Sequence, residues 1–259
     1  MTRIASAIKT NPWLACPRLN SEAQLRLFCF PYSGAGASIF FGWSKDLPPI
    51  VEVFPVQLPG RENRLVDPPL SRMEELVEAA CGALLPHLDK PFAFFGHSLG
   101  ALLGFELARI LRSEHGVQPV HLFVSSHAAP QIPDDEPPIH DLPEPAFVAK
   151  IRSLNGMSKE ILESRELMEL LLPILRADFA VCETYAYEDE EPLDCPISAY
   201  GGLRDEHVSR ADLDAWRLQT RRSFSLRMFP GDHFYLNADR SRLLHALMKD
   251  LKLTTPARQ

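Results

Sequence analysis

The sequence predicts an α/β fold with a mostly parallel central sheet, helices on both faces and one helical insertion. Short apolar runs alternate with longer stretches that have apolar residues three and four positions apart. The runs are apolar at nearly consecutive positions, which is typical of parallel strands covered on both faces. Between the fourth and fifth runs lies a long helical pattern that no β-rich run interrupts.

The composition is that of an ordinary globular protein. The 259 residues are 46% hydrophobic and 24% charged. This length suits a single α/β domain, which we expect over residues 25–259, after an N-terminal arm of residues 1–24. The formal net charge of −7, with no block of basic residues, gives no support to nucleic-acid binding. We expect no membrane partner, because no apolar run approaches the length of a membrane span.

The cysteines and the N-terminus favour a cytoplasmic location. Five cysteines are an odd number, they are widely spaced, and none forms a C-x-x-C pair. Reduced thiols that serve as small hydrophobic residues explain this pattern, and it suggests no metal site. The first nine residues lack the continuous apolar segment of a secretory signal.

The first half of the chain is expected to supply four strands and two long helices. An N-terminal arm with Pro12 and Pro17 is expected to be loose. Met73–Leu85 has apolar residues at helical spacing, and a second helical pattern begins at Leu99 with almost no breaker. The predicted strands are Leu25–Pro31, Val51–Val56, Phe92–Phe95 and His121–Ser125.

The second half begins with the insertion, which we place at about residues 131–190. Its first part, Gln131–Pro145, is rich in proline and acidic residues and predicts a loop, whereas the pattern from Pro145 to about Tyr187 is helical. An active-site lid and an ordinary peripheral helical layer are both consistent with it. Its excess of apolar residues favours a lid that also lines an apolar pocket. The remaining elements are strands at Cys195–Tyr200 and Ser225–Phe229 and helices at Arg210–Thr220 and Arg240–Leu251.

The most informative stretch is Gly96-His97-Ser98-Leu99-Gly100, which fits Gly-x-Ser-x-Gly and joins a buried strand to a long helix. Such a strand–turn–helix is the nucleophile elbow of the α/β-hydrolase fold. Changing from strand to helix within one residue forces Ser98 into unfavourable backbone angles, which Gly96 and Gly100 permit because they have no Cβ. The pattern alone is short enough to arise by chance, but its flanks favour a catalytic serine.

A second feature of this fold is the oxyanion hole. The run Leu25–Pro31 leads directly into a loop of small residues, Tyr32–Ser38. In α/β-hydrolases such a loop supplies one backbone N–H, and the residue after the nucleophile supplies another. We therefore expect the amides of Ser33 and Leu99 to bind the oxyanion, although a glycine-rich turn is also a common structural joint.

A serine nucleophile needs a base and an acid, which follow it in the order Ser, Asp or Glu, His. His233 lies just after the last strand, in a glycine-containing loop, and His207 is the only other candidate that lies in a loop. Asp205 follows the strand before, with Glu206 as the alternative acid. We assign Ser98, Asp205 and His233 as the triad. His97, within the elbow, is expected to face away from the pocket.

The chain resembles the type II thioesterases that stand alone beside modular polyketide synthases and nonribosomal peptide synthetases. The resemblance covers about Leu25 to Leu251, and the family's triad corresponds to the same Ser98, Asp205 and His233. One departure is Asp232, where a glycine is common in the family. The resemblance is carried by Phe30-Pro31-Tyr32-Ser33-Gly34-Ala35-Gly36, Leu58-Pro59-Gly60-Arg61-Glu62, the elbow, Gly231-Asp232-His233-Phe234 and the insertion segment Leu171–Phe179 with Glu183 and Tyr185.

The resemblance implies an editing hydrolase. Such enzymes remove aberrant or stalled acyl groups from the phosphopantetheine thiol of acyl- or peptidyl-carrier proteins, so the carrier is the expected partner and the enzyme needs no cofactor of its own. We expect a monomer. Because carriers are usually acidic, a local basic patch is expected to dock them, and solvated surface charge is the alternative explanation for most of its candidates. These are Arg61, Arg64, Lys150, Arg152 and Lys159.

Three other functions fit parts of the sequence. A carboxylesterase or lipase acting on small oxygen esters shares the elbow, and a chain-releasing thioesterase is a second alternative. A noncatalytic protein that keeps the fold to bind an acyl chain or a carrier is a third alternative, against which the intact set of Ser98, Asp205 and His233 argues.

Overall fold

The computed structural model describes residues 11–15, 20–134, 136–154, 156–157 and 159–253. The core of the fold is a six-stranded sheet with the order β2-β1-β3-β4-β5-β6, in which every neighbouring pair is parallel. Each strand lies on an apolar run of the sequence, so the predicted parallel sheet is confirmed. The strands are β1 (Leu25–Phe30), β2 (Val51–Pro55), β3 (Phe92–His97), β4 (His121–Ser125), β5 (Ile197–Gly202) and β6 (Phe224–Phe229).

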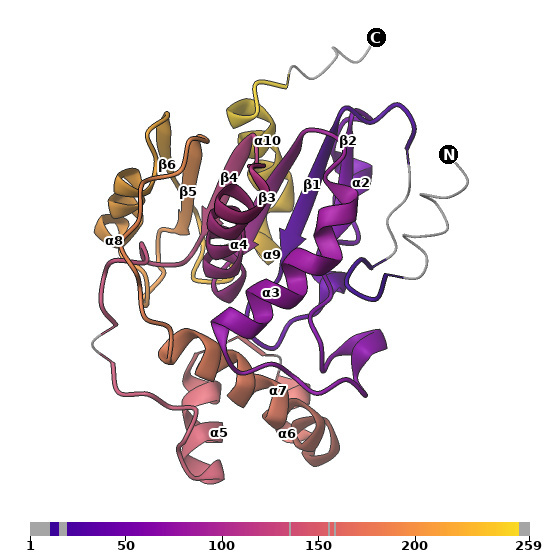
Figure 1. Ribbon diagram of the computed structural model, residues 1–259. Helices are drawn as coiled ribbons and strands as arrows, with labels where there is room; N and C mark the ends of the chain where they lie inside the picture. The colour runs from indigo at the N-terminus through magenta and orange to yellow at the C-terminus, as the bar shows by residue number, and fades with distance from the viewer. Residues whose placement is uncertain (1–10, 16–19, 135, 155, 158, 254–259) are drawn as a thin grey trace.

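Helices cover both faces of the sheet, as predicted. They include α2 (Trp43–Asp46), α3 (Met73–Leu84), α4 (Leu99–His115), α8 (Arg210–Asp214), α9 (Tyr235–Ala238) and α10 (Arg240–Asp250). In the view of Figure 1, α3 and α4 lie in front of the sheet and α10 lies behind it. Because successive side chains of a strand point to opposite faces, Phe94 packs with α3 and α4, whereas Phe95 packs with α2 and α10.

The helical insertion lies between β4 and β5. It contains α5 (Glu144–Ser153), α6 (Lys159–Glu163) and α7 (Arg165–Glu183). Figure 1 shows these helices together beyond the sheet, on the side toward which the arrow of β1 points. Their apolar residues form a core of their own, which includes Phe147, Ile151 and Leu172. The apolar excess of this segment therefore has a packing explanation and does not by itself argue for an apolar pocket.

Two local expectations differ from the structure. Residues 11–15 are not loose, because Trp13 and Leu14 are buried against the core and Arg64 lies over the Trp13 ring. The helix expected over Arg210–Thr220 is α8 followed by a 3-10 turn, Ala215–Gln219. That turn buries Trp216, whose Nε1–H donates to the carbonyl of His127 at 2.8 Å, a tertiary contact that helical spacing does not reveal. The domain boundaries remain a prediction.

Candidate active site

Ser98 lies in the sharp turn that the sequence predicts. Its backbone angles are φ 53° and ψ −122°, a strained conformation for a residue with a Cβ, and α4 begins at the next residue. A Cβ on Gly96 would lie 1.9 Å from the Gly100 carbonyl oxygen, and one on Gly100 would lie 2.2 Å from that of Phe30. Both positions therefore require glycine, and the turn packs directly against the end of β1.

The two amides expected to bind an oxyanion come from α4 and from the loop after β1, whose end packs against this turn. Leu99 is the first residue of α4, where a backbone N–H has no acceptor within the helix and the helix dipole is positive. Ser33 follows the end of β1 by three residues. Within the part of the chain that the structure describes, its N–H has no hydrogen-bond acceptor. Leu99 is fully buried, so the use of both amides as oxyanion donors stays a prediction.

Asp205 and His233 meet at the carboxyl ends of β5 and β6. The Nδ1 of His233 lies 2.9 Å from the Oδ2 of Asp205, whose side chain is fully buried. The other oxygen, Oδ1, accepts the amides of His207 at 3.0 Å and Val208 at 3.2 Å. Because Nδ1 faces a carboxylate, Nε2 is the ring nitrogen left to accept a proton.

Burial of Asp205 would raise the pKa of its carboxyl group. The hydrogen bond and the charge of His233, together with the His207 amide, outweigh that effect and lower the pKa below its usual value. The carboxylate therefore stays ionised. The alternative acid, Glu206, is exposed, and the alternative base, His207, is an exposed residue that contributes its backbone amide to Asp205.

His97 connects the serine turn to the loop that holds His233. Its ring centre lies 5.3 Å from that of His233, and Ser98 is the residue after it. Among the described residues, no hydrogen bond joins the Ser98 hydroxyl to His233. Such bonds are often long in unliganded enzymes and shorten when substrate binds.

The ring of His97 lies within the core beside His233, and whether it faces away from the substrate pocket stays a prediction. It is fully buried, and its Nδ1 lies 2.8 Å from the Ser125 hydroxyl, which lies 2.6 Å from that of Tyr235. Burial and then the nearby charge of His233 hold the pKa of His97 well below its ordinary value, so the ring is neutral. Strand alternation could have revealed this position, because His97 lies two residues after Phe95 and shares its face.

The insertion touches the site at two places. A Cβ on Gly156 would lie 2.6 Å from the Phe234 ring, next to His233, and one on Gly34 would lie 2.7 Å from Leu175 on α7. Also on α7, Asp178 accepts the amide hydrogen of Gly34 through Oδ2 at 2.7 Å. The insertion therefore contacts both the loop that holds His233 and Phe234 and the loop that holds Ser33.

Two of the five basic residues proposed to dock a carrier are not free to do so. Arg61 is 4% exposed and forms an ion pair with Asp178, and Arg64 is 9% exposed and forms one with Asp67. Sequence reasoning treated both as surface charges. The remaining three, Lys150, Arg152 and Lys159, are exposed and lie on α5 and α6.

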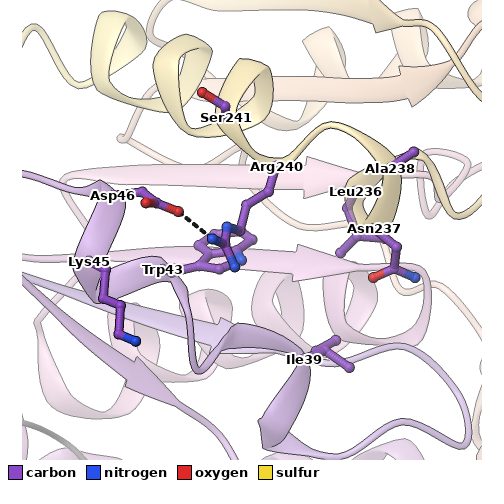
Figure 2. Close-up of a pocket in the computed structure, with 9 residues that line it drawn as sticks. All are labelled: Ile39, Trp43, Lys45, Asp46, Leu236, Asn237, Ala238, Arg240 and Ser241. Atoms are coloured by element: carbon purple, nitrogen blue, oxygen red, sulfur yellow. Dashed lines mark ion pairs between the residues drawn. The ribbon is translucent and has the colours of Figure 1, made fainter.

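A separate groove of about 640 Å³ lies between α2 and the helices α9 and α10 (Figure 2). Arg240 reaches across it to Asp46, with 2.6 Å between Nη2 and Oδ2. None of Ser98, Asp205 and His233 lines this groove, so it is not the site described above. Its lining residues are Ile39, Trp43, Lys45, Asp46, Leu236, Asn237, Ala238, Arg240 and Ser241.

Over the described ranges, no group of three or more His, Cys, Asp and Glu side chains is arranged to hold a metal ion. The described helices also include none that is long and apolar enough to cross a membrane. Four cysteines are free thiols, and burial raises the pKa of each: Cys29, Cys81, Cys182 and Cys195. Cys16 lies outside the described residues.

Comparison with known proteins gives a consistent family. Residues 25–251 match the model of the thioesterase domain family. Gramicidin S biosynthesis protein GrsT of Aneurinibacillus migulanus is 48% identical over 245 residues, which is 95% of this chain and 96% of that protein.

Two solved structures have the same architecture. The RedJ thioesterase from the prodiginine pathway of Streptomyces coelicolor superposes with a TM-score of 0.84 at 42% identity, over 91% of this chain and 93% of RedJ. The type II thioesterase BorB from the borrelidin biosynthetic cluster gives a TM-score of 0.83 at 34% identity, over 92% and 96% of the two chains. These likenesses support the α/β-hydrolase fold predicted from the elbow.

Proposed function

The chain belongs to the thioesterase domain family, and we propose that it hydrolyses the thioester that joins an acyl group to the phosphopantetheine arm of a carrier protein. The relatives named above serve gramicidin S, prodiginine and borrelidin biosynthesis, which favours a carrier protein of a polyketide synthase or nonribosomal peptide synthetase as the partner. Within such a system the proposed role is editing, the removal of aberrant or stalled acyl groups.

In the proposed mechanism, Ser98 Oγ attacks the thioester carbonyl while Nε2 of His233 accepts its proton. Asp205 holds Nδ1–H of His233, which fixes the tautomer and stabilises the imidazolium that forms. The protonated His233 then gives its proton to the departing thiolate. Water, deprotonated by His233, attacks the acyl-enzyme and releases the acid and free Ser98.

The negative charge on the attacked oxygen is proposed to be held by the amides of Ser33 and Leu99. Each donor of this kind contributes on the order of 3 kcal/mol to the stability of the transition state in comparable enzymes. The neutral state of His97 supports this mechanism, because a second cation beside His233 would oppose the imidazolium.

The observation that carries the proposal is the hydrogen bond of 2.9 Å between His233 and the buried Asp205, beside a strained serine turn. Asp205 and His233 are 28 positions apart in the sequence, so only the fold brings them into contact. The role of Ser98, 107 positions before Asp205, is part of the proposal. The arrangement suits acyl transfer and offers nothing specific to another reaction class.

The test is mass spectrometry of acetyl-, propionyl- and longer acyl-loaded carrier protein after incubation with wild-type or Ser98→Ala enzyme. We expect the acyl mass to disappear with the wild type only. Matched oxygen esters are assayed in parallel. Intact acyl carriers together with rapid oxygen-ester hydrolysis would contradict the proposal in favour of a carboxylesterase. Hydrolysis confined to a full-length product chain would contradict the editing role in favour of chain release.

A further inference from the structure

The loop that carries Ser33 is held by a buried ion pair. Arg61 and Asp178 form two hydrogen bonds, from Nη1 to Oδ2 and from Nη2 to Oδ1, each 2.7 Å long. Their side chains are 4% and 2% exposed. Arg61 follows β2, and Asp178 lies 117 positions later on α7, so the pair joins the insertion to the sheet.

Both partners of this pair also bind the backbone of the small-residue loop. Asp178 Oδ2 accepts the Gly34 amide at 2.7 Å, and Arg61 Nη1 donates to the Ala35 carbonyl at 3.2 Å. Leu175, one turn before Asp178, packs against Gly34, which has a positive φ of 79°. The residue directly before Gly34 is Ser33, whose amide is left without an acceptor.

The free-energy cost of burying Arg61 and Asp178 suggests that the pair does more than stabilise the fold. A buried ion pair seldom stabilises a protein more than apolar side chains of similar volume would, because both charges lose their hydration. An ion pair does impose direction, since a guanidinium and a carboxylate bind side by side in a fixed plane. Here the pair orients Gly34 and Ala35. The Ala35 N–H in turn donates at 3.0 Å to the Tyr32 carbonyl, which belongs to the peptide that bears the Ser33 N–H.

We propose that Arg61 and Asp178 are positioning residues for the oxyanion hole: they hold the Gly34 turn so that the Ser33 amide points at the developing oxyanion. The pair also makes the oxyanion hole dependent on the insertion, because one of its two members lies on α7. This inference rests on the proposed roles of Ser98 and Ser33.

The test uses the full chain with Asp178→Asn, which keeps the shape of the side chain and removes its charge. The matched control is Glu52→Gln, because Glu52 forms an equally buried pair with Arg26, at 4% and 2% exposure, far from the site. Two rates are measured: turnover of acetyl-loaded carrier, and covalent labelling of Ser98 by a fluorophosphonate. In labelling, Ser98 Oγ bonds to phosphorus, fluoride leaves, and the proton passes to His233.

We expect Asp178→Asn to lower kcat and the labelling rate roughly 10- to 100-fold with little change in KM, which is less than the ~10²- to 10³-fold cost of deleting an oxyanion donor. Glu52→Gln is expected to leave both rates within about twofold, whatever it does to the Tm. Equal slowing by the two variants would overturn the proposal.

A second variant separates positioning from folding. Arg61→Met combined with Asp178→Leu removes both charges, so the Tm is expected to recover toward the wild-type value while the rates stay low. Recovery of the rates together with the Tm would overturn the proposal and leave the pair a purely structural role. The labelling assay needs no carrier protein. If the wild type fails to hydrolyse acyl carriers, the proposed function is refuted, and the labelling rates of the variants still decide this inference.

Discussion

Two buried arginine–carboxylate pairs lie at opposite ends of the same sheet. Arg26 and Glu52 stand in register at the second positions of β1 and β2, with 3.2 Å between Nε and Oε2. Arg61 and Asp178 lie beyond the carboxyl ends of the strands and are joined by two bonds of 2.7 Å. No charged side chain in either pair is more than 4% exposed. The two pairs are therefore matched in burial and differ in place.

The difference is in what each pair holds. Arg26 also donates to the His87 carbonyl at 2.7 Å, and Glu52 accepts the Asn20 amide at 2.8 Å, so this pair ties together the starts of strands and nearby loops. Arg61 and Asp178 instead bind Gly34 and Ala35, in the loop that holds Ser33. In a parallel sheet the carboxyl ends carry the reactive groups, so an ion pair there can act on the reaction, whereas one at the amino ends acts on stability.

The largest effect should come from Asp205, the carboxylate at the carboxyl ends of the strands that contacts the proposed base, His233. Replacing Asp205 by Asn favours the wrong tautomer of His233, because an amide can donate to Nδ1. We expect kcat for acyl-carrier hydrolysis to fall about 10⁴-fold, as for the equivalent change in serine proteases. Steady-state kinetics with Glu206→Gln as the control measures it. A fall of less than tenfold would mean that Glu206 can serve as the acid.

At the amino ends, the expected effect is on stability. Glu52→Gln removes one charge and leaves Arg26 with Asp89 as its ion-pair partner. Breaking a buried pair typically costs about 3–5 kcal/mol of unfolding free energy, and the remaining partner should reduce this to about 3 kcal/mol or less. Urea unfolding gives the value, and kcat measured on the same sample should be unchanged. A lowered kcat at full folding would remove the contrast between the two ends.

A smaller effect concerns His97, whose pKa is held well below its ordinary value by burial and by His233. Below about pH 6.5 the unfolded chain binds a proton at this residue and the folded chain does not. Stability should therefore rise with pH between about 5 and 7, and the slope should be shallower in His97→Gln. Urea unfolding across this range measures it, with His245→Gln at the surface as the control. Equal slopes in both variants would contradict the assignment.

The smallest effect is the loss of stability at low pH that Asp205 causes. Its pKa is lowered by His233 and the His207 amide despite burial. A lowered folded pKa contributes stability above the unfolded value of about 3.9, and that contribution is lost as the pH falls through the folded value. Thermal unfolding between pH 5 and pH 3 should show a steeper loss for the wild type than for Asp205→Asn. A steeper loss in the variant would reverse the expected sign.

Much of the fold and the site could be predicted because the signals are local. The turn at Ser98 could be predicted from five consecutive residues between an apolar run and a helical pattern. Asp205 and His233 could be chosen because each follows a strand, and parallel strands bring their carboxyl ends to one edge. The contact between Asp205 and His233 could thus be predicted from strand order alone, and their catalytic roles stay predictions.

The remaining features depend on contacts between distant segments. The sequence around Arg61 is typical of an exposed charged residue, and its partner Asp178 is 117 positions away within a helical pattern. The ion pair between them could therefore not be predicted. Trp13 lies in a proline-containing stretch that has no periodicity to mark it as buried. The apolar excess of the insertion could not be divided between a pocket and a core, because spacing shows which residues are apolar and not what they pack against.

The most direct test of the central claim looks for the covalent intermediate on the enzyme. Wild-type protein and Ser98→Ala are mixed with acetyl-loaded carrier, quenched in acid within milliseconds to seconds, digested and examined by mass spectrometry. We predict that the peptide containing Ser98 gains the mass of one acetyl group in the wild type only, and that this mass disappears as free acid accumulates. Turnover of the carrier without any acyl group on Ser98, or equal turnover by Ser98→Ala, would contradict the account.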